Sequence, residues 1–284
     1  MNEPAVSLSR STADVRALLF DTFGTVVDWR SGIARDAGPF LARHGIAADP
    51  HEFADAWRAR YQPAMEEVRS GGRPFTRLDL LHRENLDAVL RDFGADPGRL
   101  PADSLDDLNR AWHRLDPWPD CLVGLTRLRA RFIIAPLSNG NLALLLNMAK
   151  RARLPWDAIF GADVSRSYKP QREAYTRTAE ALGLAPAECM MVAAHNSDLR
   201  AARNAGLATA FVLDRWSTAR IRRVTWWQRK LGTSWRWISV AWPSAWVPEG
   251  TGPTSARSGF ASPPWTSGRS QARANWRAES RPLP

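Results

Sequence analysis

Short apolar runs alternate with helical patterns over much of this chain. Residues 15–20 form the first run, which stops at Asp21 and passes into a turn at Gly24, as a buried strand does. Further apolar runs occur at residues 132–137, 158–162, 190–194 and 209–213. This alternation predicts βαβ units and a parallel sheet. Pro136 is an objection to the second run, because proline cannot donate a hydrogen bond to a strand ladder.

Residues 32–117 follow a different pattern. Apolar side chains recur there at helical spacing with charged residues between them, as in Phe53, Trp57 and Tyr61. Glycine and proline breaks at residues 71–72 and 96–98 divide this stretch. We therefore expect a helical insertion over residues 32–117 between two parts of one core domain, residues 1–31 and 118–213.

The composition changes again in residues 214–284. This segment holds nine of the fourteen tryptophans, 12 of the 39 Lys and Arg residues and only 3 of the 29 Asp and Glu residues. It has no sustained apolar period, so we expect an unpatterned basic tail that forms no packed domain. Its Trp and Arg side chains have the chemistry to stack on bases and pair with phosphates, but the irregular pattern does not favour a nucleic-acid partner.

The rest of the chain is nearly neutral, with 27 basic and 26 acidic residues outside the tail. No stretch approaches the roughly 20 apolar residues of a membrane span, and residues 1–15 lack the pattern of a signal peptide. The two cysteines, Cys121 and Cys189, show neither a disulfide framework nor metal-ligand spacing. We expect a cytoplasmic protein without a membrane partner, whose thiols are packing residues.

Polar residues follow the predicted strands, where open α/β sheets bind ligands. Asp21 ends the first strand and is placed to act as a nucleophile, with Thr25 four residues later as a hydrogen-bond donor. Ser138 and Asn139 follow the second run. Each of these residues is also a common turn former, so none carries the assignment alone.

Four segments in fixed order carry a more specific signal. They are Phe20-Asp21-Thr22-Phe23-Gly24-Thr25, Leu137-Ser138-Asn139-Gly140, Tyr168-Lys169-Pro170 and His195-Asn196-Ser197-Asp198. Together they resemble the motifs of the haloacid dehalogenase superfamily, in particular its L-2-haloacid dehalogenase (type II) branch, over residues 15–213. The resemblance implies a doubly wound, Rossmann-like α/β core with a helical cap inserted after the first motif.

Phe23 distinguishes between branches of that superfamily. Phosphatases of the superfamily generally carry a second aspartate two residues after the nucleophile, which protonates the departing alkoxide. A phenylalanine cannot transfer a proton, and a halide needs none because it is a very weak base. The residue at this position therefore favours a carbon–halogen hydrolase.

The resemblance also implies roles for individual residues. Asp21 attacks C2 of a short 2-haloacid and forms an aspartyl ester, while Arg58 of the cap and Asn139 stabilise the departing halide. Ser138 binds the substrate carboxylate and Thr25 orients Asp21.

The resemblance assigns the hydrolysis of that ester to a second group of residues. Asp198 activates the water and Lys169 keeps Asp21 ionised. Tyr175 matches a tyrosine of the site and is expected, with His195 and Asn196, among the substrate-binding residues. No cofactor or metal is implied, and a homodimer is allowed because many relatives dimerise.

The sequence departs from the family pattern in three ways. The first is that Ala193 stands where a serine is expected and His195 where an asparagine is expected, with Asn196 one place later. The second is that Ser197 replaces a tryptophan. His195 either replaces an amide contact or makes the site pH-sensitive. The third departure is the tail, which replaces further core structure.

Two other functions stay open. A magnesium-dependent phosphatase of the same superfamily would hold its metal with Asp21 and Asp198. A non-catalytic protein that binds through its basic tail is the other alternative.

Overall fold

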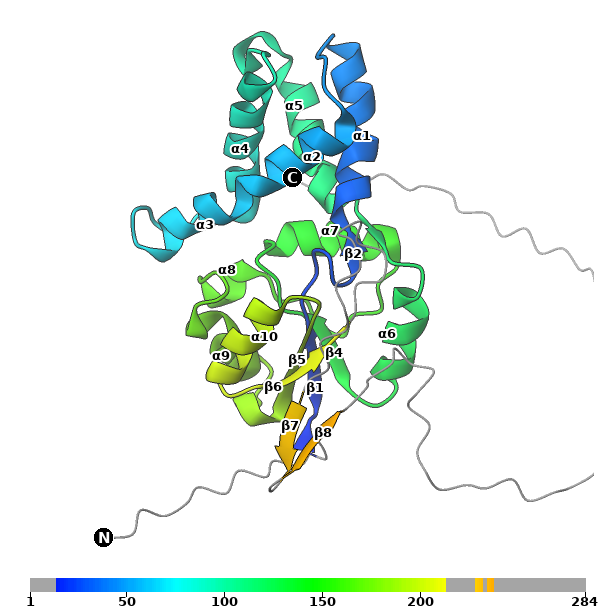
Figure 1. Cartoon of the computed structure of the whole chain (residues 1–284), viewed down its shortest axis with the longest axis vertical. Helices are drawn as coiled ribbons and strands as arrows, with labels where there is room; N and C mark the ends of the chain where they lie inside the picture. Colours follow the sequence, from blue (N-terminus) through cyan, green and yellow to red (C-terminus); the bar gives the residue numbers. More distant parts are fainter. Residues whose placement is uncertain (1–13, 213–227, 232–233, 238–284) are drawn as a thin grey trace, which may run out of the picture. The chain divides into compact units, whose positions relative to one another are not determined.

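The computed structural model describes residues 14–212, 228–231 and 234–237, and its centre is a parallel sheet (Figure 1). The four strands are β1 (Ala17–Phe20), β4 (Ile133–Pro136), β5 (Cys189–Ala193) and β6 (Ala208–Phe211), in the order β4-β1-β5-β6. β1 is internal to the sheet and all four of its residues are buried. The predicted α/β fold with a Rossmann-like core is confirmed.

Helices cover both faces of this sheet. Leu18 and Phe20 of β1 belong to the same apolar cluster as residues of α6 (Cys121–Arg129) and α7 (Leu142–Ala152). Ala17 and Leu19 point to the opposite face, where they cluster with α9 (Arg172–Ala181) and α10 (Asn196–Asn204). Successive strand residues thus pack into two separate apolar cores, which explains why the strand sequences are continuously apolar.

The expected strand at residues 158–162 is wrong. Only one bridge forms, between Leu137 and Phe160, and the short helix α8 (Ala162–Ser165) begins at the end of the run. Upstream of the bridge, the backbone N–H of Ile134 donates to the side chain of Asp157 at 3.0 Å, so a carboxylate replaces a ladder carbonyl. Downstream, a Cβ on Gly161 would lie 2.5 Å from the carbonyl oxygen of Gly140, so the chain turns at this close contact.

Pro136 fits in β4 because of the strand's position. The backbone N–H groups of Ile133 and Leu137 donate to the carbonyls of Arg16, just before β1, and Phe20, at its end, so the N–H position of Pro136 faces away from β1. β4 is an edge strand of the four-stranded sheet, and its outer side meets only the irregular segment around Phe160. The missing donor therefore costs no ladder hydrogen bond.

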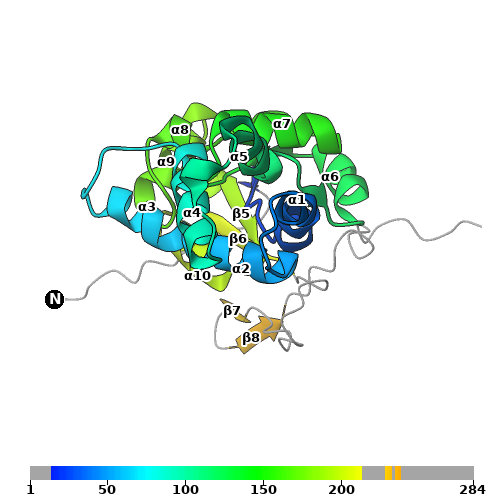
Figure 2. The same ribbon diagram turned by 90° about the horizontal axis from the view of Figure 1, so that it is seen from above.

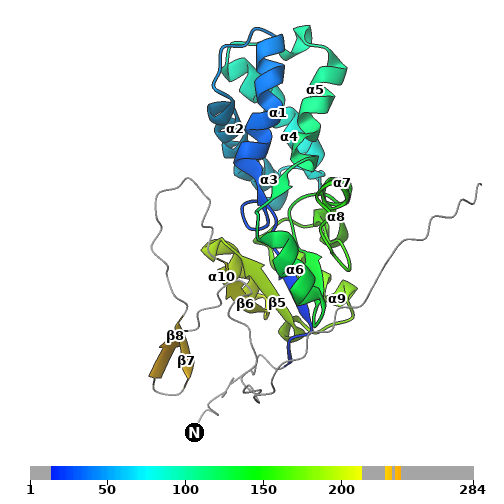
Figure 3. The ribbon, with the colours of Figure 1, turned by 90° about the vertical axis from the view of Figure 1, so that its right-hand side faces the viewer.

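The segment between β2 (Val27–Asp28) and β3 (Asp116–Pro117) is helical, and these two short strands pair antiparallel at its base. Its elements are α1 (Trp29–Arg43), α2 (Pro50–Ala59), α3 (Tyr61–Arg69), α4 (Leu78–Asp92), η2 (Pro97–Arg99), α5 (Ala102–Asn109) and η3 (Arg110–His113). Figures 1 and 3 show α1, α2, α4 and α5 gathered beyond one end of the sheet, and in the view from above they lie in front of it (Figure 2). We call this segment the cap; its predicted borders at residues 32 and 117 stay predictions.

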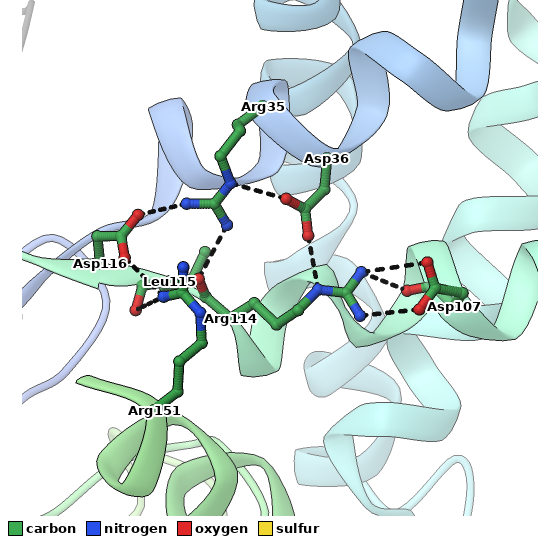
Figure 4. Close-up of polar contacts among 7 residues, drawn as sticks. All are labelled: Arg35, Asp36, Asp107, Arg114, Leu115, Asp116 and Arg151. Carbon is green, nitrogen blue, oxygen red and sulfur yellow. Dashed lines mark hydrogen bonds and ion pairs between the residues drawn. The ribbon is translucent and has the colours of Figure 1, made fainter. Parts of the chain in front are cut away.

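An alternating series of charges joins the cap to the core next to β3 (Figure 4). Arg35 pairs with Asp36 and Asp116, and Asp116 also accepts from Arg151 of α7 at 2.6 Å. Arg114 bridges Asp36 and Asp107 at 2.8 and 2.9 Å. We call these six residues the hinge ion cluster, since they tie α1, α5 and α7 to the segment through which the chain returns to the core.

Outside this region, β7 (Gln228–Leu231) pairs antiparallel with β8 (Ser234–Trp237). The sequence pattern did not predict this pair, and the rest of the expected tail lies outside the described residues.

In the part of the chain that is described, no helix combines the length and apolarity needed to cross a bilayer. Cys121 and Cys189 are free and buried, and burial raises the pKa of their thiols to about 12 and about 11.

The hinge ion cluster gives a test of cap attachment. Replacing Asp116 with Asn removes the negative charge that pairs with Arg35 and Arg151, and we expect the free energy of unfolding to fall by about 0.5–1 kcal/mol, as for exposed ion pairs within a network. The loss is expected to shrink in about 1 M NaCl because salt screens these charges. Urea unfolding at both salt concentrations measures it.

Glu180→Gln is the control, because Glu180 is exposed on α9 and the same charge is removed there. An equal change in both variants would show that the hinge ion cluster contributes nothing specific to stability.

Candidate active site

Asp21 is placed by the sheet and by the turn that follows. Its N–H donates to the carbonyl of Val192 at 3.0 Å, which extends the pairing of β1 with β5 by one residue. The next turn closes through Gly24, whose φ of +83° is a conformation that glycine adopts without strain. The carboxylate is left at the carboxyl end of the sheet, and Asp21 is only 7% exposed.

Three side chains contact the two oxygens of this carboxylate. Lys169 Nζ donates to Oδ1 at 2.9 Å. Thr25 Oγ1 donates to Oδ2 at 2.8 Å, and the Nδ1 atom of His195 lies 2.8 Å from the same oxygen. The Thr25 hydroxyl itself accepts from the N–H of Ala194 at 3.0 Å, so its proton is directed at Asp21.

Lys169 connects Asp21 to the second buried carboxylate. Its Nζ donates to Asp198 Oδ2 at 2.5 Å, and the other oxygen of Asp198 accepts from Tyr175 Oη at 2.7 Å. The backbone N–H of Lys169 donates to Asn139 Oδ1 at 2.8 Å. The loop after β1 and the start of α10 therefore meet at the Lys169 ammonium group, and the loop after β4 meets the backbone of the same residue.

The charges in this cluster stabilise one another. Burial would raise the pKa of Asp21, but Lys169 and His195 together lower it well below its usual range. Burial would lower the pKa of Lys169, but the two carboxylates raise it above its usual range. Asp21 is therefore an ionised, acceptor-only carboxylate at neutral pH, and Lys169 remains protonated.

The residues after β4 are buried and face the same region. Ser138 accepts from the N–H of Gly140 at 3.1 Å through its hydroxyl, which turns the loop tightly. Asn139 uses its amide oxygen for Lys169, which leaves the amide N–H₂ group directed elsewhere. Asn139 also interacts with Tyr61 of the cap, which partly offsets the rise that burial causes in the pKa of the Tyr61 hydroxyl.

Arg58 on α2 lies among aromatic rings. Its guanidinium carbon is 4.0 Å from the ring centre of Tyr61, 5.4 Å from Trp29 and 5.7 Å from Phe23. Its Nη1 atom is buried, with no hydrogen-bond partner in the described part of the chain. A buried donor of this kind is costly unless an acceptor reaches it, so this cap position is suited to an anion.

Phe23 is part of the same apolar wall. It is 2% exposed and packs edge-to-face against Tyr61 and Trp112, with ring centres 6.2 and 5.7 Å away. The position that carries an acid in phosphatases of the superfamily is thus filled by a ring that continues into the cap.

Two of the predicted site residues are placed differently from the others. Asn196 is exposed at the start of α10 and makes no side-chain hydrogen bond within the described residues. Tyr175, expected to bind substrate, is fully buried and directs its hydroxyl to Asp198.

Sequence reasoning missed two residues near the site, Tyr61 and His82. Tyr61 appeared only as a helical packing position, although it lies three residues after Arg58. His82 stacks on Trp112 with ring centres 4.3 Å apart, and neither of its ring nitrogens has a partner among the described residues. Burial lowers the pKa of His82 to about 3, so its ring is neutral at neutral pH. Isolated aromatic and histidine positions in a helical pattern give no signal that distinguishes such a site wall from an ordinary core.

A parallel sheet with helices on both faces, a buried carboxylate at its carboxyl end and an inserted helical segment define a capped, Rossmann-like α/β protein with a candidate nucleophile at the end of β1. The model of the haloacid dehalogenase-like hydrolase family matches residues 15–206. The chain belongs to this family.

Relatives with known names fall within the same family. The defluorinating L-2-haloacid dehalogenase Rha0230 is 59% identical, with 71% of this chain and 82% of that chain covered and a TM-score of 0.70. The (S)-2-haloacid dehalogenase of Xanthobacter autotrophicus is 29% identical over 203 residues, 70% of this chain and 75% of the relative. The structure of the L-2-haloacid dehalogenase from that organism with chloropropionic acid covalently bound covers 70% of this chain and 77% of that chain, with 28% identity and a TM-score of 0.61. Hexitol phosphatase A of Escherichia coli is 27% identical over 183 residues, 62% of this chain and 73% of the relative.

The lysine between the two carboxylates gives a stability prediction. In Lys169→Met, Asp21 and Asp198 lose their counter-ion, and we expect the free energy of unfolding at pH 7 to fall by about 3 kcal/mol. The loss is expected to be smaller at pH 5, because the unpaired carboxylates can take up a proton while the wild-type Asp21, with its lowered pKa, stays ionised. Urea unfolding at the two pH values measures the difference.

The double variant Lys169→Met with Asp198→Asn is the matched control. It removes the repulsion together with the lysine, so more than half of the lost stability is expected to return. A single variant as stable as the wild type at pH 7 would contradict the electrostatic account of the cluster.

Proposed function

We propose that this chain hydrolyses the carbon–halogen bond of short (S)-2-haloacids through an ester on Asp21. The observation that carries the proposal is a combination of three features. Asp21 is buried and ionised, and Phe23 stands where phosphatases of the superfamily carry a second aspartate. Arg58 has a buried Nη1 atom without a hydrogen-bond partner among the described residues. The named relatives support the substrate class.

In the first step, an oxygen of Asp21 attacks C2 of the substrate from the side opposite the halogen. The C2–O bond forms as the carbon–halogen bond breaks, and the halide leaves with the bonding electrons. No proton is needed, because halides are very weak bases. Lys169 keeps the attacking carboxylate ionised and buried, which favours the nucleophile.

The departing halide and the substrate carboxylate both need positive partners. Arg58 has an unpaired buried N–H, and Asn139 has an amide N–H₂ not used by Lys169, so these two residues suit the developing halide charge. Ser138 and the backbone N–H groups of its loop suit the substrate carboxylate.

In the second step, water attacks the carbonyl carbon of the Asp21 ester. Asp198 lies on the other side of the Lys169 ammonium and acts as the base, held in place by Tyr175. The 2-hydroxyacid then leaves with the oxygen that attacked in the first step, and Asp21 regains a carboxylate. The configuration at C2 is inverted overall.

The phosphatase alternative is weaker because Phe23 cannot protonate an alkoxide. Binding through the basic tail would rest mostly on residues outside the described part of the chain, which includes only residues 228–231 and 234–237 of that tail. We further propose that the enzyme needs no cofactor and works in the cytoplasm. A homodimer stays a prediction, which light scattering of the purified protein tests.

The nucleophile gives the most direct test of the proposal. Asp21→Asn is expected to lower halide release from (S)-2-chloropropionate and fluoroacetate by at least about 1,000-fold, because an amide cannot displace the halide. Wild-type activity is expected to persist in a chelator. Ion chromatography measures halide, and mass spectrometry after turnover in ¹⁸O water is expected to find the label in Asp21.

The named alternatives give different results in the same assays. Phosphate release from small esters that needs magnesium, with no halide release, would identify a phosphatase. No turnover of either substrate class by the wild type would refute an enzymatic function.

Substitution of Arg58 is expected to lower activity without lowering stability. Arg58→Met is expected to lower kcat/KM for halide release by about 100-fold or more, because the cationic partner of the halide is lost. Its Tm is expected to stay the same or rise, since the variant removes a buried donor that has no partner in the described part of the chain. Halide assays and thermal unfolding measure the two effects.

Arg60→Met is the control on the same helix end. Arg60 pairs with Asp92 on α4, so this variant is expected to lose slight stability and keep kcat/KM within about two-fold. Equal losses of activity in both variants would argue against an anion site at Arg58.

A further inference from the structure

The two oxygens of Asp21 have different surroundings. Within the described part of the chain, Oδ1 accepts from Lys169 alone, whereas Oδ2 accepts from Thr25 and lies 2.8 Å from His195 Nδ1. A carboxylate oxygen offers about two lone-pair sites, so two donors saturate Oδ2 and one site stays open on Oδ1.

Both donors on Oδ2 have a fixed direction. The Thr25 hydroxyl accepts from the N–H of Ala194, so its own proton points to Asp21. His195 Nδ1 faces an ionised carboxylate that can only accept, so this nitrogen carries a proton in the neutral ring and in the charged ring alike. Neither donor needs to reorient during the reaction.

Resting on the proposed function, we infer that Oδ1 is the attacking oxygen and that His195 and Thr25 form an oxyanion hole at Oδ2 for hydrolysis of the ester. After attack, Oδ1 links Asp21 to C2, and Oδ2 becomes the ester carbonyl oxygen. Water adds to Cγ as Asp198 takes its proton, and the negative charge of the tetrahedral intermediate develops on Oδ2.

The intermediate then collapses with a balanced transfer of atoms. The Cγ–Oδ1 bond breaks, Oδ1 leaves with the product and takes the proton held by Asp198, and Asp21 releases its remaining proton to solvent. Donors aimed at the oxygen where charge develops accelerate this step more than the first step, in which charge leaves the carboxylate. His195 is thus a catalytic residue of the second half-reaction, in contrast to the substrate-binding role expected from sequence.

The position of His195 provides a matched pair of variants. The amide nitrogen of Asn can take the place of Nδ1, whereas the amide of Gln reaches toward the place of Nε2. The His195 side chain is 46% exposed, so neither change opens a cavity in the core. His51, exposed on α2, serves as the control for loss of a histidine.

Rapid quenching of enzyme mixed with (S)-2-chloropropionate resolves the two steps. For His195→Gln, we expect one halide per site to be released within about three-fold of the wild-type rate, followed by steady turnover about 100-fold slower. Intact-protein mass spectrometry is expected to find the ester on Asp21 in nearly every molecule. His195→Asn is expected to recover most of the turnover without accumulating ester, and His51→Ala to behave as the wild type does.

Two results would overturn the inference while leaving the proposed function intact. In the first, His195→Gln slows the first turnover as much as the steady state, and no ester accumulates. In the second, His195→Gln leaves the steady turnover unchanged. A wild-type enzyme that releases no halide would instead refute the proposed function and this inference with it.

Discussion

The Lys169 ammonium holds two buried carboxylates together, and the arrangement of the whole site depends on that contact. Asp21 and Asp198 would repel each other in a buried setting without a cation between them, and each would tend to take up a proton. The same residue binds Asn139 through its backbone. One lysine therefore fixes the nucleophile, the proposed base and a proposed halide ligand relative to one another.

The charges of the site also explain why the buried Nη1 atom of Arg58 has no hydrogen-bond partner among the described residues. Lys169 lies between both carboxylates, so neither Asp21 nor Asp198 needs a second cation. The aromatic rings of Tyr61, Trp29 and Phe23 hold the guanidinium by cation–π contacts, which position a charge without neutralising it. Its positive charge is left for an anionic substrate, and this is the reason a position unfavourable for stability suits the proposed reaction.

The sequence predicted the parts of the fold that depend on local pattern. The strands β1, β4, β5 and β6 lie within or beside the apolar runs, and the ordered motifs identified Asp21, Lys169 and Asp198 although 148 residues separate the first two. The prediction of a strand at residues 158–162 was wrong for two local reasons. The Asp157 side chain accepts a hydrogen bond from the backbone of β4, and the close contact of Gly161 with Gly140 turns the chain. The roles of Tyr61 and His195 could not be predicted, because they depend on which oxygen or ring each side chain meets after the cap and core come together.

Phe23 matters both for the proposed release of halide and for the packing of the cap. A reaction that expels a halide needs no proton donor beside the nucleophile, so this position is free to hold an aromatic ring. That ring packs against Tyr61 and Trp112, which extends the apolar core of the cap down to the turn after Asp21. An acid at the same place would need water or a polar partner, and it would interrupt this contact. Because the ring keeps the surroundings apolar, the charges of Arg58, Lys169 and Asp21 act in a medium of low polarity, where each electrostatic contact is stronger than it would be in water.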